Sequence, residues 1–114
     1  MRGLNHWNGA GNVTNTITFA KTGKGADVCT FTMACDRYMA DGTVTVWVKV
    51  NVYMGALVQR CRERLARGTY VVIEGELMNR DGRIGELLEV RAREIIFPPG
   101  PVRDGAEGEV PNGS

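Results

Sequence analysis

The segment from Thr43 to Tyr53 constrains the fold of this 114-residue chain more than any other part of its sequence. Valine occupies every even-numbered position from 44 to 52, and the residues between are polar or aromatic. Strict alternation over eleven residues predicts a β-strand with one buried face, and the valines must form that face. The opposite face then displays a lysine and an asparagine with two aromatic side chains: Trp47, Lys49, Asn51 and Tyr53.

Further segments show strand-like patterns on both sides of this one. Val28–Cys35 alternates in the same way, and Asp41-Gly42 separates the two segments, so they are expected to form a hairpin. A tight turn with Asp-Gly at its corner is predicted at Arg80–Arg83. The other candidate strands are Asn5–Val13, Thr16–Ala20 (a short strand or an extended loop), Tyr70–Leu77 and Leu87–Phe97.

A single helix is expected between the third and fourth strands. Within residues 54–68, Leu57, Cys61 and Leu65 recur at helical spacing, which predicts an amphipathic helix of about three to four turns. Gly68 suits the C′ position that follows a helix, and the arginines at 60, 62, 64 and 67 are interpreted as a solvated face. The predicted fold is therefore all-β: a five-stranded OB barrel with one α-helix between strands 3 and 4.

Composition limits the function classes. Residues 1–97 are the expected folded domain, and residues 98–114, which hold all four prolines, are the expected flexible tail. No run of 18 apolar residues and no signal-like N-terminus is present, so we expect a cytoplasmic protein that does not enter a membrane. Three cysteines without a Cys-x-x-Cys pair and a single histidine argue against disulfides, a metal site and cysteine–histidine catalysis. We expect no enzyme activity and no cofactor.

Charge alone does not identify a nucleic-acid binder. The formal net charge is +1, with 13 basic and 10 acidic side chains in residues 1–100 and one basic against three acidic in residues 101–114. The body of the chain is thus mildly basic and the tail mildly acidic, which is only a weak sign of an anionic partner.

Several segments, taken in order, resemble the bacterial and phage single-stranded DNA-binding proteins over residues 5–97. They are Gly11–Val13, Phe31–Arg37, Trp47, Val50–Leu57, Leu65–Leu77 and Glu89-Val90. The resemblance implies an OB-fold protein that binds single-stranded DNA during replication, recombination or repair and forms a homo-oligomer, most often a tetramer, with a dimer as the alternative. It implies a place at the nucleoid or in a phage-infected cell. The acidic Pro-Phe tip of the family is absent, so recruitment of replication and repair proteins is not implied.

The resemblance also suggests which residues contact DNA. Family aromatics stack on bases, and Trp47 and Tyr53 match two such positions, while Tyr38 lies near a third. Sequence-independent binding also needs cations for phosphates, and Lys49 lies between the two aromatics on the same face. The candidate DNA-binding residues are Trp47, Tyr53, Tyr38, Lys49, Asn51, Arg80, Arg83, Arg37, Lys21 and Lys24.

Each assignment has a structural alternative. Trp47 and Tyr53 also suit packing, Trp47 in particular at a subunit interface, and Trp7 is interpreted as a core or interface residue. Arg80 and Arg83 also suit a solvated hairpin tip. At the level of function, the alternatives are a primosomal OB protein that acts mainly through protein partners, and an OB module that binds RNA or protein.

Overall fold

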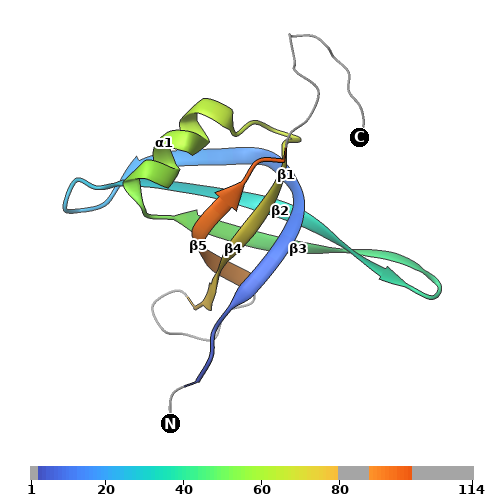
Figure 1. Ribbon diagram of the computed structural model, residues 1–114. Coiled ribbons are helices and arrows are strands. Elements are labelled where there is room, and N and C mark those ends of the chain that lie inside the picture. The colour runs from blue at the N-terminus through green and yellow to red at the C-terminus, as the bar shows by residue number, and fades with distance from the viewer. Residues whose placement is uncertain (1–2, 80–87, 99–114) are drawn as a thin grey trace.

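Five strands close into a barrel in the computed structural model, which describes residues 3–79 and 88–98 apart from the side chain of Asn15 (Figure 1). The elements are β1 (Trp7–Lys21), β2 (Asp27–Met39), β3 (Gly42–Val52), α1 (Gly55–Arg64), β4 (Tyr70–Met78) and β5 (Leu88–Ile96). The order around the barrel is β1-β2-β3-β5-β4, with β3 parallel to β5 and the other neighbours antiparallel. This topology, with α1 between β3 and β4, confirms the predicted OB fold.

Apolar side chains at alternating positions along the strands fill the interior of the barrel. Val48, Val50 and Val52 are fully buried, as are Phe31 and Met33 on β2. The helix closes one end of the barrel with three more buried side chains: Leu57, Val58 and Cys61. The described residues contain no helix with both the length and the apolar character needed to cross a membrane.

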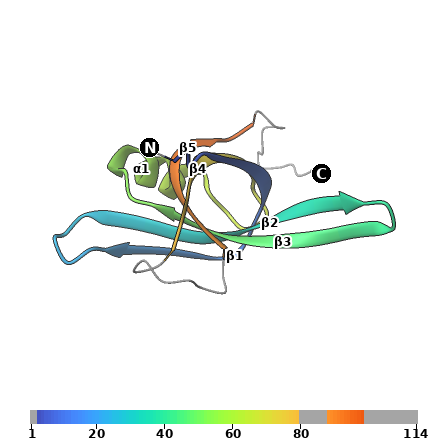
Figure 2. The ribbon, with the colours of Figure 1, turned by 90° about the horizontal axis from the view of Figure 1, so that it is seen from below.

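The β2–β3 hairpin extends beyond the barrel (Figure 2). The predicted turn at Asp41-Gly42 is confirmed, and the strand predicted at Val28–Cys35 continues to Met39. Near this turn each strand pairs only with the other, so neither face meets the core. Val44 is 48% exposed for this reason, and the prediction that all five valines are buried is wrong at this position.

The N-terminal region forms one long strand. β1 pairs with β4 through residues 7–12 and with β2 through residues 12–21, and its register shifts between Val13 and Ile17. The shift lies where β1 changes its pairing partner from β4 to β2, and the alternation of the sequence is interrupted there. Trp7 packs partly against the core, and its ring lies so close to Gly9 that a Cβ at this position would be 2.2 Å from it. Trp7 is thus a packing residue, in agreement with the first of its two predicted roles, core or interface.

The helix is shorter than the predicted three to four turns. It spans ten residues, and Leu65 at its C-terminus is already extended, with φ −82° and ψ 133°. Gly68 is therefore not the C′ residue. Its φ of 88° belongs to the following turn, where its N–H donates to the carbonyl of Val13 over 2.7 Å and connects the turn to β1.

The helix arginines were predicted to form a solvated face; Arg62 and Arg64 are indeed exposed, but they and Arg60 also contact the barrel. Arg60 donates to Glu94 at 3.1 Å and to the carbonyl of Ile95 at 2.7 Å. The guanidinium of Arg62 lies 4.5 Å from the ring centroid of Phe19, and that of Arg64 lies 4.7 Å from the ring centroid of Phe97. Planar guanidinium groups stack well on aromatic faces, so these side chains hold α1 against the barrel.

Candidate nucleic-acid interface

The outer face of β3 carries the candidate interface. Trp47 is 56% exposed there, and Lys49 is half-buried two residues farther along. Their neighbours on β2 are small: Ala34 pairs with Trp47 and Thr32 pairs with Lys49. Small neighbours leave the indole uncovered, so a flat ligand group has access to it. This arrangement follows from the alternation that buries Val48 and Val50 beneath.

Two tyrosines lie at opposite ends of this face. Tyr38 is 81% exposed near the tip of the hairpin, opposite Thr43, and by alternation it shares the face of Ala34 and Trp47. Tyr53 follows β3 directly, is 37% exposed, and lies six residues from Trp47, roughly 20 Å for an extended chain. Tyr38 and Trp47 thus share one face of the hairpin, and Tyr53 follows at the end of β3.

Arg37 does not share that face. It is exposed, but alternation along β2 directs it to the side of the hairpin opposite Tyr38. Arg37 therefore does not share a face with Trp47 and Tyr38.

Asn51 is not displayed, contrary to the sequence prediction. The side chain is only 4% exposed, because β5 and β4 pack beside it. Its amide nitrogen donates to Glu89 at 3.1 Å and contacts the sulfur of Met78 at 3.7 Å, and its oxygen accepts from Thr30 at 3.3 Å. Asn51 therefore connects four strands beneath the surface and is not available to a ligand.

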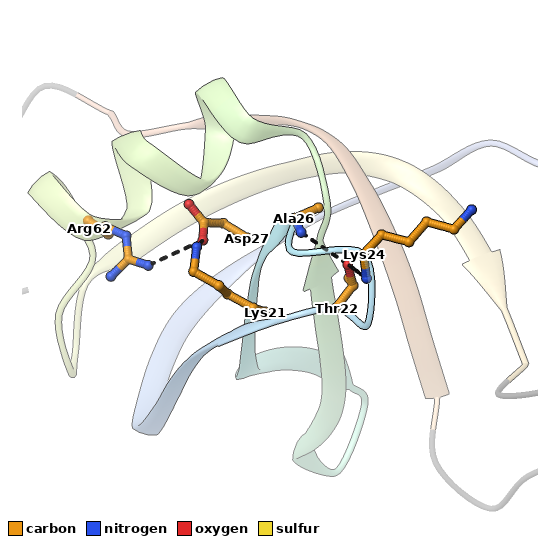
Figure 3. Close-up of polar contacts among 6 residues, drawn as sticks. All are labelled: Lys21, Thr22, Lys24, Ala26, Asp27 and Arg62. Atoms are coloured by element: carbon orange, nitrogen blue, oxygen red, sulfur yellow. Dashed lines mark hydrogen bonds and ion pairs between the residues drawn. The ribbon is translucent and has the colours of Figure 1, made fainter.

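The two lysines of the β1–β2 turn, Lys21 and Lys24, have different surroundings (Figure 3). Lys21 donates to Asp27 at 2.6 Å, and this bond and its charge lower the pKa of the Asp27 carboxyl. Arg62 of α1 lies 4.0 Å from the same carboxylate, so Lys21 belongs to the helix side of the barrel. Lys24 extends away from this cluster, in a turn that the Thr22 hydroxyl stabilises by accepting two backbone N–H groups.

Arg80 and Arg83 lie outside the described residues, as do the predicted turn between them and the tail from residue 99, so these assignments stay predictions. The structure adds a residue that sequence reasoning missed. Arg91 of β5 is exposed, and its guanidinium lies 5.0 Å from the ring centroid of Tyr53. The only sequence signal was its alternation with the buried Val90 and Ala92, which gives its face but not its neighbour.

The cysteines take no part in this face. Cys29 of β2 and Cys61 of α1 are both fully buried, and the hydrogen bond between them together with burial raises the pKa of the Cys29 thiol. Cys35 is half-buried, and none of the three forms a disulfide. In the described part of the chain, no three side chains of the metal-binding types gather at one place.

A small closed barrel with exposed aromatics along one strand and a cation between them defines a nucleic-acid-binding OB protein as a class. The comparison with known families identifies the particular one: residues 5–96 match the single-strand binding protein family, and the chain belongs to it. Membership in this family also agrees with a binding protein that is not an enzyme.

Individual relatives agree with this assignment. The chain is 32% identical over 99 residues to the single-stranded DNA-binding protein 2 of Chlorobaculum tepidum, an alignment that spans 77% of this chain and 66% of that protein. In fold it is similar to the structure of a Plasmodium falciparum SSB complex with ssDNA, with a TM-score of 0.74 and 20% identity over 87% of this chain and 98% of the other. The small single-stranded DNA-binding protein of Streptomyces coelicolor gives a TM-score of 0.69 with 22% identity over 86% and 95% of the two chains.

Proposed function

We propose that this protein binds single-stranded DNA without sequence preference and coats exposed strands during replication, recombination and repair in the cytoplasm. The observation that carries the proposal is the exposed indole of Trp47 opposite the small Ala34, with Lys49 two residues farther along the same strand. Every base has a π-face, so an indole that stacks on it tolerates any sequence, and an ammonium group beside it neutralises phosphate. Family membership and the names of the relatives support the same function.

The direct test is a fluorescence titration of the protein with oligo-dT at several salt concentrations. We expect the tryptophan emission to be quenched on binding, and log K to fall linearly with log salt. Duplex DNA of the same length should bind much more weakly, because its bases are not free to stack. If an RNA of equal length binds more tightly, the protein is an RNA-binding OB module. If a protein partner rather than DNA length governs binding, it is a primosomal protein.

The salt dependence should distinguish the two lysines that the sequence offers as DNA contacts. Lys49→Ala is expected to make the slope of log K against log salt shallower by about 0.7, the value for one phosphate on a single strand. Lys21→Ala should leave the slope unchanged, because Lys21 is paired with Asp27 on the helix side. Equal changes in both variants would mean that the DNA path also crosses the β1–β2 turn.

A second copy of the chain is the other proposed partner. On the outer surface of β1, β4 and β5, the apolar residues Ala10, Val72 and Ile96 lie in register across three strands, beside Tyr70. Ile96 is 49% exposed and Tyr70 is 51% exposed. Exposed apolar residues in register on the outside of a sheet favour contact with a second such sheet, and linked DNA-binding faces gain avidity. The proposed assembly is a tetramer, with a dimer as the alternative.

Ile96→Glu is expected to dissociate this assembly, because it places a charge in an apolar contact. Sedimentation velocity should show a smaller species at micromolar concentration, with an unchanged circular dichroism spectrum. Val44→Glu is the control, since Val44 is about equally exposed but lies on the hairpin. Loss of assembly in the Val44 variant alone would place the subunit contact on the hairpin.

A further inference from the structure

Arg91 and Tyr53 form a contact that lies at one end of the candidate DNA-binding face. The guanidinium of Arg91 is 5.0 Å from the ring centroid of Tyr53, and both side chains are exposed. The parallel pairing of β3 with β5 causes this approach, because it places Arg91 next to Asn51, two residues before Tyr53. A guanidinium over the ring is a weak, reversible cover at an exposed site.

The charge of Arg91 is not neutralised by the carboxylates around it. Glu76, its pairing partner on β4, accepts a hydrogen bond from Arg93 at 2.8 Å. Glu89, two residues before Arg91 on β5, accepts from the buried amide of Asn51. Within residues 3–79 and 88–98, Arg91 makes no ion pair, and its guanidinium lies over the ring of Tyr53. Its guanidinium is therefore available to an anion.

We propose that Tyr53 and Arg91 together form a nucleotide subsite, in which a base replaces the guanidinium on the tyrosine ring and Arg91 turns to the phosphate of the same nucleotide. This subsite rests on the proposed function and adds one unassigned residue, Arg91, to it. Base–aromatic stacking is stronger than an exposed cation–π contact, so the exchange is favourable. The long side chain of Arg91 reaches the phosphate by rotation alone, and its fork suits two phosphate oxygens.

The subsite continues the candidate DNA-binding face of β3 past the buried Asn51. Trp47 and Lys49 form a first pair of stacking ring and cation on β3, and Asn51 beyond them is buried. Tyr53 and Arg91 then repeat the same pair of chemical groups on the far side of that residue, with the cation supplied by β5. A single strand that follows β3 thus meets two separate places where one base stacks and one phosphate is neutralised.

The test measures oligo-dT binding by Arg91→Ala, Arg91→Lys, Tyr53→Ala and the Arg91→Ala/Tyr53→Ala double variant. We expect Arg91→Ala to weaken binding about 10-fold and to reduce the salt slope by about 0.7. Arg91→Lys should keep the slope, because the charge remains. In the double variant the two losses should not add, because both residues act on one nucleotide.

The matched control is Arg93→Ala, on the same strand, since Arg93 is exposed but already bonded to Glu76. If Arg91→Ala behaves like Arg93→Ala while wild-type protein binds and Trp47→Ala binds weakly, the subsite is wrong and the proposed function stands. Strictly additive losses in the double variant would also overturn the subsite. If wild-type protein itself does not bind oligo-dT, the proposed function fails. Thermal melts of each variant check that the exposed substitutions leave the barrel folded.

Discussion

Gly75→Ala is expected to lower the free energy of unfolding by about 3 kcal/mol, because it forces a methyl group into backbone. A Cβ at Gly75 would lie 2.1 Å from the carbonyl oxygen of Arg91 and 3.0 Å from its carbonyl carbon. These atoms belong to the neighbouring strand β5, at the point where the β4–β5 register shifts. Backbone cannot rotate away as a side chain can, so the two strands must separate. For a domain of this size the loss lowers Tm by roughly 10 °C or more.

The control for this prediction is Gly23→Ala. Gly23 lies in the β1–β2 turn, where a Cβ would have no atom within 4 Å, and its φ lies outside the left-handed region that favours glycine. Its replacement should change the stability by less than about 0.5 kcal/mol, as for most surface substitutions. Differential scanning calorimetry of both variants gives the comparison. An unchanged Tm for Gly75→Ala would show that β4 and β5 can separate at this point without loss of stability.

Strand positions were predictable where one face of a strand is buried along its length. In β3 the alternation of valines is local information, and it correctly gave the burial of Val48, Val50 and Val52 and the exposure of Trp47. The same reasoning failed at Val44, because alternation gives a side chain's face but not where the barrel ends. The helix end was misplaced for a similar reason: Leu65 leaves the helix to pack against the core, a tertiary contact that no spacing reveals.

Pairing between distant strands accounts for the site residues that the sequence misassigned or missed. Asn51 shares the alternation of Trp47 and Lys49, yet it is covered because β5 pairs with β3 in parallel beside it. The same pairing brings Arg91 to Tyr53. Lys21 was predicted as a DNA contact from its basic loop, but the fold brings Asp27 within 2.6 Å of it. In each case a partner from another element decides whether a polar side chain is available.

Trp47→Ala is expected to weaken oligo-dT binding by about 1–3 kcal/mol, the usual worth of one stacked base, which is roughly 5- to 150-fold in Kd. The indole is 56% exposed and is not part of the buried core, so its removal should leave no cavity in the core and should change the Tm little. The loss of affinity has one physical cause, the missing π-face of the indole. Alanine retains the strand and Lys49, and only the π-face is missing, so the salt slope should remain that of the wild type.

The chain provides its own control, because it holds two tryptophans in different environments. Trp7 packs partly against the core over Gly9, so Trp7→Ala should lower the Tm and leave DNA affinity nearly unchanged in the folded protein. Trp7→Phe keeps most of that packing and leaves Trp47 as the single indole, whose emission should then carry the full quenching on DNA binding. In Trp47→Ala the remaining emission from Trp7 should respond little to DNA. If the quenching stays with Trp7, or if Trp47→Ala loses stability instead of affinity, then Trp47 is a packing residue and the DNA path lies elsewhere on the barrel.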